Sequence, residues 1–585
     1  MLHDAFVHRL VFGTDVVFTF GPYGFLYFGA TPQTYPLTLM GWLLIAAAWC
    51  VVVWKTLGLS TLPKCAQWAG AMLVTALTAS VDVVDAQIFA FTAFASTAWI
   101  KTRPRDIPTN VVVGAALALA SLVKFSWFIA ILPCVAVITF YGLIRERRSA
   151  LIGAVYAVFL IVLWLVAGQS LASVVNYISS SMEITSGYAE AMQLAHPWGM
   201  SNVWSFVFIA TALTGLPLVV WFKRDWFTAI ALSGITGFLL LIAFKAGFVR
   251  HDHHEVVSMA VLASIAIIQF HVVAQRTIPS IAAVLSLVLF GTCMQLHDRN
   301  PSFEERLGQT IRLGGVTDLF RFLGSREDVK QHFANDMKPI AERQPFNLPD
   351  GTVDLYPWGG IDAMYANKLN VRHRPVFESY SAITDTLAKR NRDFLLTESA
   401  PDHLLFAVRS LDQRFPSMDD GLSWPEILSH YDIEGEQSGY LLMSRRETPV
   451  PYRLIELQET GLQPETMVPL PEADALWGQI ELPLKTRGGI LKQFYKPAVL
   501  ILAVQMADGS THAFRFLPSV ASAGFLISPV IPNTEAFAVF RNRPDDPRLS
   551  SLRPRAIAIT GEAGFNEHYY FQQAKVRFSR LEFGE

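Results

Sequence analysis

Ten apolar stretches, none with a charged residue, follow one another through the first half of the chain and alternate with short polar segments. They cover residues 37–54, 65–81, 86–100, 107–123, 125–144, 149–168, 202–222, 226–244, 256–275 and 277–296. Most approach the roughly 20 residues that an α-helix needs to cross the hydrocarbon core of a bilayer. The pattern therefore predicts a polytopic α-helical membrane protein with about ten spans.

One apolar region is too long to form a single span. Residues 107–144 would overshoot the bilayer as a single helix, and the only charge within them is Lys124, in "VKFSW". We therefore expect one span to end and the next to begin at Lys124.

Lysine and arginine between the predicted spans indicate the orientation, because they favour the cytoplasmic side. Alternate loops hold Lys55, Lys64, Lys101, Arg103, Arg105, Arg145, Arg147, Arg148, Lys223, Arg224 and Arg276, whereas the opposite loops hold only Lys124, Lys245 and Arg250. The loops that hold the first set are therefore predicted to lie on the cytoplasmic side. We therefore expect a multi-pass protein of the bacterial inner (plasma) membrane, with its N-terminal segment and C-terminal domains on the periplasmic or outer side.

Four regions of the chain differ in their pattern of apolar and polar residues. Residues 1–34 form a predicted external loop, residues 35–298 the transmembrane bundle, and residues 299–450 an external α/β domain in which short strands alternate with helices. Residues 451–585 are rich in strands and turns and predict a β-sandwich. Asp508-Gly509 predicts a hairpin there, and the other predicted strands are "GFLISPVI", "EAFAVF", "RAIAIT" and "AKVRFSRLEF".

The external N-terminal loop has no signal segment to carry it across the membrane. We expect a further span upstream of Met1 and a longer native chain.

Composition agrees with the membrane assignment, since only 16% of the residues are charged against roughly 25% in soluble proteins. The net charge of -2 provides no basic field for nucleic acid. The four cysteines form neither a disulfide framework nor a zinc-binding spacing.

The stretch "FGTDVVFTFGPYGFLYF" (residues 12–28) contains one acid, Asp15, among aromatic residues and a Gly-Pro turn. A carboxylate at the outward interface can accept a proton from an attacking hydroxyl, so Asp15 is a candidate general base. The alternative is an acid that caps a turn or a helix.

A second acidic motif is "VDVVD", in which Asp82 and Asp85 share a short outward hairpin. Two nearby carboxylates can share a divalent cation, Mg²⁺ or Mn²⁺, although a complete site needs more ligands. The alternative is a polar hairpin tip that stays in water.

The outward loop "FKAGFVRHDHHE" is the third candidate. Its Lys245, Arg250 and His251, together with Lys124, are candidate substrate-binding residues that would hold a phosphate. The same loop also permits zinc binding through its three histidines and Asp252, or contact with anionic lipid.

These groups suit one reaction, the transfer of a sugar from a lipid-phosphate donor, in which a base activates the acceptor and cations stabilise the leaving phosphate. A transporter is less consistent with the sequence, because it would carry acids or bases near the middle of the spans.

With about ten spans, an acidic first outward loop and a soluble C-terminal region, the chain resembles the GT-C class of integral-membrane glycosyltransferases, which use polyprenyl-linked sugars. "FGTDVVFTFGPYGFL", "GFVRHDHH" and "RHRPVFESYSAITDTLAKRNRDFLL" are similar to segments of an uncharacterised bacterial membrane-protein group related to that class. The resemblance implies a GT-C-like bundle with Asp15 as the base and Asp82 with Asp85 as the second acidic motif. It also implies a polyprenyl-linked sugar donor and a glycan or lipid acceptor as partners.

Two alternatives stay open. The base of the class follows its first helix, so the base could instead be Asp4 or precede Met1. The protein could also be non-catalytic and use its external sandwich to bind or organise surface polysaccharide.

Overall fold

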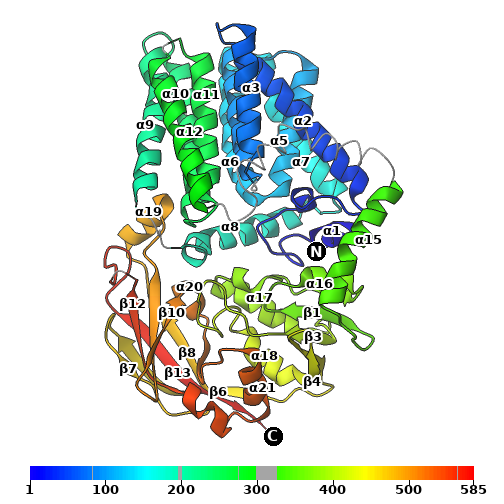
Figure 1. Cartoon of the computed structure of the whole chain (residues 1–585), viewed down its shortest axis with the longest axis vertical. Helices are drawn as coiled ribbons and strands as arrows, with labels where there is room; N and C mark the ends of the chain where they lie inside the picture. The colour runs from blue at the N-terminus through cyan, green and yellow to red at the C-terminus, as the bar shows by residue number, and fades with distance from the viewer. Residues whose placement is uncertain (82–83, 195–199, 275, 298–325, 563, 585) are drawn as a thin grey trace. The chain divides into compact units, whose positions relative to one another are not determined.

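A computed structural model describes residues 1–81, 84–194, 200–274, 276–297, 326–562 and 564–584 (Figure 1). The chain forms two compact units that interleave in sequence. The helical unit comprises Met1–Leu10, Thr19–Leu171 and Leu194–His332, and the β-rich unit comprises Val11–Phe18, Ala172–Gln193 and Phe333–Glu585. A helical membrane region and a β-rich C-terminal region are therefore both present, as predicted.

Ten long helices make up most of the described part of the helical unit, and each occupies one of the ten apolar stretches. They are α2 (Tyr35–Leu57), α3 (Lys64–Ala79), α4 (Asp85–Thr102), α5 (Ile107–Val123), α6 (Phe125–Arg145), α7 (Leu151–Val166), α9 (Ser201–Trp221), α10 (Trp226–Phe248), α11 (Glu255–Val272) and α12 (Thr277–His297). Within the described residues, seven helical segments are long and apolar enough to cross a membrane. The chain is thus of the multi-pass type, and the count of ten spans stays a prediction.

The described part of this unit also contains the short elements α1 (Leu2–Val7), η1 (Gly24–Tyr27) and η2 (Arg147–Ala150). Helix α15 (Arg326–Arg343) contains the boundary between the two units in sequence.

The division predicted at Lys124 is confirmed. Helix α5 ends at Val123, Lys124 is extended (φ -141°, ψ 134°), and α6 begins at the next residue. Arg105, just before α5, donates from Nη2 to Glu146 Oε2, just after α6, at 2.7 Å. Because the start of α5 and the end of α6, the two ends distant from Lys124, lie next to each other, α5 and α6 form an antiparallel hairpin.

The basic loops gather at one end of the helical unit. Besides the Arg105–Glu146 contact, three contacts join them, between Lys55 and Asp106 (3.7 Å), Arg145 and Asp225 (2.5 Å), and Arg276 and Thr61 (2.6 Å). This confirms that the five basic loops share one end of the bundle. The side of the membrane on which they lie stays a prediction.

Charged residues on the ten helices are confined to the first or last turn of each helix. They are Lys55, Lys64, Asp85, Lys101, Arg145, Lys245 and Glu255. The middle of each apolar helix is thus free of Asp, Glu, Lys and Arg, as expected where burial of a charge in hydrocarbon is costly.

The first part of the β-rich unit contains a five-stranded sheet in the order β2-β1-β3-β5-β4. Strand β1 is parallel to β2 and β3, and β5 is antiparallel to β3 and β4. The strands are β1 (Thr352–Tyr356), β2 (Asn370–Val371), β3 (His403–Phe406), β4 (Tyr431–Gln437) and β5 (Tyr440–Arg445). The accompanying helices are α16 (Ile361–Ala366), η3 (Ser379–Ser381), α17 (Asp385–Leu395) and α18 (Ser423–His430).

Two four-stranded sheets follow, in the orders β10-β9-β12-β7 and β11-β8-β13-β6. Their strands are β6 (Tyr452–Leu462), β7 (Val468–Pro469), β8 (Leu476–Glu481), β9 (Leu500–Met506), β10 (Thr511–Phe516), β11 (Phe525–Ser528), β12 (Pro554–Gly561) and β13 (Ala574–Phe583). Ile480 and Phe578 of one sheet share a buried core with Leu502 and Ile559 of the other. The two sheets therefore pack face to face as a sandwich.

The hairpin predicted at Asp508-Gly509 is confirmed, since β9 and β10 pair antiparallel on either side and Gly509 has φ +87°. The predicted strand "EAFAVF" is wrong. It lies in helix α21 (Thr534–Asn542), where the Asn533 side chain accepts from the Ala536 backbone N–H at 2.8 Å. An Asn at the N-cap favours this helix, and Phe537 and Phe540, three residues apart, bury one face of it.

The other helices of this region are α19 (Thr486–Phe494), α20 (Pro518–Ala521) and η4 (Pro547–Leu552).

Helix α8 (Ser173–Ala191) belongs to the β-rich unit although its sequence lies between α7 and α9. Its last carbonyl, that of Ala191, accepts from Nη2 of both Arg414 and Arg515 at 2.7 Å. Cations at a helix C-terminus donate hydrogen bonds to its unpaired carbonyls and interact favourably with the negative end of its dipole. These contacts explain why α8 folds with the C-terminal region.

Candidate functional site

Lys124 and Asp85 form an ion pair at the end of the helical unit opposite the basic loops. Lys124 Nζ donates to Asp85 Oδ1 at 2.9 Å and to Oδ2 at 2.8 Å. The two side chains are 19% and 6% exposed. The rings of Phe20 and Tyr27 lie 5.5 and 5.2 Å from the Lys124 ammonium, so the cation is held by a carboxylate and two aromatic faces.

The second half of the opening stretch stabilises this position. Thr19 accepts from the Phe125 N–H at 3.0 Å, and Gly21 donates to the Val123 carbonyl at 2.9 Å. A one-residue break between apolar helices leaves backbone groups unpaired, which is costly in a membrane unless another segment satisfies them. Residues near the Gly-Pro turn thus bind the backbone on both sides of Lys124.

The predicted metal site at Asp82 and Asp85 is placed only in part, because Asp82 lies outside the described residues. Both Asp85 oxygens accept from Lys124, so an ammonium takes the place at Asp85 where a divalent cation was expected. Mg²⁺ or Mn²⁺ at this motif stays a prediction.

The loop between α10 and α11 forms a second polar group at the same end of the unit, since successive helices reverse direction. Asp252 is its centre and accepts from Arg250 Nε at 3.0 Å. Its other oxygen accepts from the His254 N–H at 3.0 Å and lies 2.6 Å from His254 Nδ1. Burial opposes ionisation of Asp252, but its contacts with His254 and Arg250 outweigh burial and hold its pKa well below the usual range.

Asp252, His253 and His254 have ligand atoms within 4.8 Å of one another and could hold a metal ion. Asp252 is already engaged by His254 and Arg250, however, so this contact network competes with a metal. Zinc at this loop therefore stays one of several predictions.

His251 extends the group into the bundle. Its Nδ1 lies 2.5 Å from Glu255 Oε1, and neither side chain is exposed. Glu255 Oε2 accepts from Asn202 Nδ2 of α9 at 3.2 Å and lies 3.8 Å from Cys293 Sγ of α12. The carboxylate thus joins the ends of three helices and orients the imidazole.

Asp85 and Glu255 are linked by the fold. Each is the first residue of its helix, and α4 packs against α11. Because both helices start at the same end of the unit, the two polar groups lie on neighbouring helices. Lys245, the remaining predicted cation, is half-buried in the last turn of α10 at that end.

Asp15 belongs to the β-rich unit, whereas the predicted cations belong to the helical unit. Its side chain is exposed, and Oδ2 accepts from the Val11 N–H at 2.9 Å, which closes a tight turn. The contact is the one expected of a turn-capping acid. The catalytic role of Asp15 stays a prediction.

No family model, curated protein or solved structure matches the chain.

Sequence reasoning missed Asn202 and Glu255 as members of the site. One signal was present, because His251 and Glu255 are only four residues apart, and the turn that leads into α11 brings their side chains together. Asn202 carries no such signal, since only the packing of α9 against α11 brings it to Glu255.

Proposed function

We propose that this protein is a GT-C-like membrane glycosyltransferase that moves a sugar from a polyprenyl-phosphate donor to a glycan or lipid acceptor. The reaction takes place at the outward face of a bacterial inner membrane. The observation that carries the proposal is the placement of charge. The apolar helices hold charged residues only in their terminal turns, and at one end of the unit buried Asp85 meets the Lys124 ammonium and buried Glu255 meets the His251 imidazole.

The chemistry of the donor fits this arrangement. A polyprenyl phosphate leaves as an anion and needs positive charge, which Arg250 and Lys245 provide at the end where α10 meets its loop. The acceptor hydroxyl needs a base, for which Asp15 is the candidate. The His251–Glu255 pair positions the loop that carries Arg250.

The test compares a strain that lacks the protein with strains that express Asp15→Asn, Arg250→Gln or Glu582→Gln. Glu582 is a surface acid of β13 and serves as the matched control. Mass spectrometry of surface glycans is expected to show the same missing sugar in the first three strains and none in the control. Unchanged glycans in Arg250→Gln and Asp15→Asn, at normal protein levels, would refute the proposal.

A further inference from the structure

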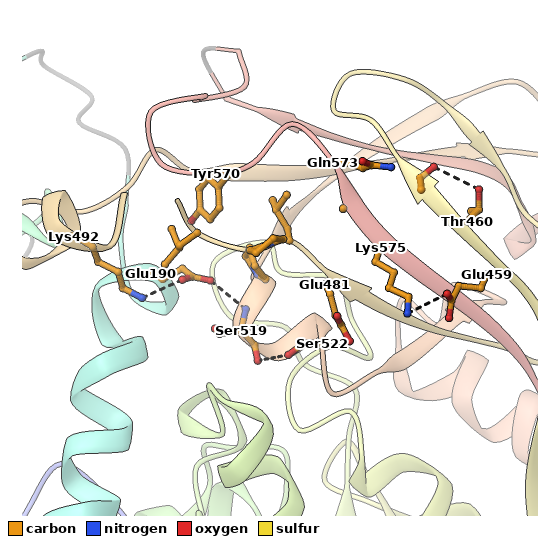
Figure 2. Close-up of a pocket in the computed structure, with 16 residues that line it drawn as sticks. Glu190, Glu459, Thr460, Glu481, Lys492, Ser519, Ser522, Tyr570, Gln573 and Lys575 are labelled. Carbon is orange, nitrogen blue, oxygen red and sulfur yellow. Dashed lines mark hydrogen bonds and ion pairs between the residues drawn. The ribbon is translucent and has the colours of Figure 1, made fainter. Parts of the chain in front are cut away.

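A cleft of about 800 Å³ opens in the β-rich unit, near the start of β13 and the end of α8 (Figure 2). Its lining is polar on several sides and comes from β6, β8, β13, α8, α19 and α20. The volume lies within the roughly 300–1,000 Å³ that is typical of pockets for small ligands.

Two buried hydroxyls in this lining have no hydrogen-bond partner within the described part of the chain. They are Ser519 Oγ and the hydroxyl of Tyr570, whose side chain is only 1% exposed. A buried polar group without a partner costs about 1–3 kcal/mol, so a ligand or water is expected to satisfy both. Burial, and then the Glu190 carboxylate, raise the pKa of Tyr570 well above its usual value, so its hydroxyl remains a donor at neutral pH.

Charge in the cleft selects among ligands. Figure 2 shows Lys492, Glu190 and Ser519 joined by contacts on one side of the cleft and Lys575 with Glu459 on the other. The Lys492–Glu190 distance is 3.3 Å and the Lys575–Glu459 distance is 3.0 Å. With Glu481, three carboxylates face two ammonium groups, which disfavours phosphate and other anions.

The same lining suits a polyol. Carboxylates accept hydrogen bonds only, ammonium groups donate only, and the hydroxyls of Ser519 and Tyr570 do both. A sugar ring presents hydroxyls that donate and accept around its edge, and therefore satisfies such a mixed set. Leu482, Leu484 and two prolines add apolar surface to the lining.

We propose that this cleft binds a neutral or amino-bearing saccharide, with Tyr570, Ser519 and Glu481 contacting its hydroxyls. The site lies wholly within the β-rich unit. The proposal does not depend on the transferase reaction, because binding can be measured without any donor.

The test uses the full-length protein in lipid nanodiscs, since maltoside detergents would themselves present sugar. Isothermal titration with chitosan tetraose (amino-bearing), maltotetraose (neutral) and tetragalacturonate (acidic) as probes is expected to show saturable binding of at least one of the first two. Tyr570→Phe and Ser519→Ala are each expected to weaken that binding about fivefold, the loss of one hydrogen bond. Tyr569→Phe, the same change at a residue that does not line the cleft, is the matched control.

Three results would overturn the proposal. One is the absence of binding of both neutral and amino-bearing probes up to about 10 mM, weaker than most specific sites. Another is unchanged affinity in Tyr570→Phe and Ser519→Ala while both variants keep the wild-type Tm. The third is tighter binding of the acidic tetragalacturonate, which would contradict the charge argument.

Discussion

Breaking the Asp85–Lys124 ion pair should destabilise the helical unit measurably. Asp85→Asn leaves Lys124 without its carboxylate at a site where the two side chains are only 6% and 19% exposed. Unit charges about 3 Å apart attract by about 5–6 kcal/mol at an effective dielectric constant of about 20. Dehydration offsets part of this attraction, and removal of one partner of a buried pair costs about 3–5 kcal/mol.

We expect about 2–3 kcal/mol for Asp85→Asn, because Lys124 keeps some exposure and the faces of Phe20 and Tyr27. The assay is thermal unfolding of the full-length protein in nanodiscs, followed by tryptophan fluorescence. Lys124→Met should lower the Tm by a similar amount, since it leaves Asp85 unpaired.

The double variant Asp85→Asn/Lys124→Met decides whether the loss comes from the pair. It leaves no unpaired charge, so it should regain at least half of the Tm lost by either single variant. Fully additive losses would refute the reasoning. If Lys124 also binds donor phosphate, the double variant should recover stability while the surface glycan stays altered.

Three further predictions concern the β-rich unit. Burial raises the pKa of Glu378 to about 7 from 4.5, so the stability that is present below about pH 4.5 is lost as the pH rises through 7. Glu378→Gln should therefore flatten the dependence of Tm on pH and raise Tm at pH 8, and an unchanged profile would contradict this. Gly13 has φ +88°, and a Cβ there would lie 2.4 Å from Tyr177 N. Gly13→Ala should therefore lower Tm and expose residues 11–18 to protease. The control is Gly29→Ala, because Gly29 has a similar φ of +94° but a Cβ there would have no atom within 4 Å. Asn533→Ala should cost about 1 kcal/mol through loss of the α21 cap, and Asn533→Ser should restore it, whereas equal Tm values for both variants would argue against a capping role.

The helical part of the fold could be predicted from sequence because each apolar stretch is both long and free of internal charge. Even the one-residue break at Lys124 followed from length, since 38 residues cannot form a single span. The grouping of the basic loops also followed, because it depends only on the order of the helices. These features are local or periodic, so the sequence carries them directly.

The errors and omissions arise where tertiary contacts decide. "EAFAVF" has strand-forming residues, but an Asn cap and a buried Phe pair make it α21. Helix α8 carries no sequence signal for joining the β-rich unit, because Arg414 and Arg515, more than 200 residues away, hold its end. The cleft that Glu190 lines was not predicted for the same reason, because its other lining residues lie far away in the sequence.

For the candidate site, the position of the charged residues could be predicted, but their contacts could not. Lys124, Arg250 and His251 lie at one end of the helical unit, as expected, but each is held by a carboxylate of the protein itself. A sequence shows which charges are present at an end of a bundle. It does not show which of them pair.

Transfer of a labelled sugar by the purified full-length protein tests the central claim most directly. Nanodisc-bound protein is incubated with polyprenyl-phosphate sugars extracted from the deletion strain, in which the donor should accumulate, and with envelope acceptor from the same strain. We predict transfer by the wild-type protein, a loss of at least about 100-fold in Arg250→Gln, as for removal of one charge-stabilising group, and normal transfer in Glu582→Gln. No transfer by the wild-type protein, with donor and acceptor both present and the fold intact by Tm, would contradict the account.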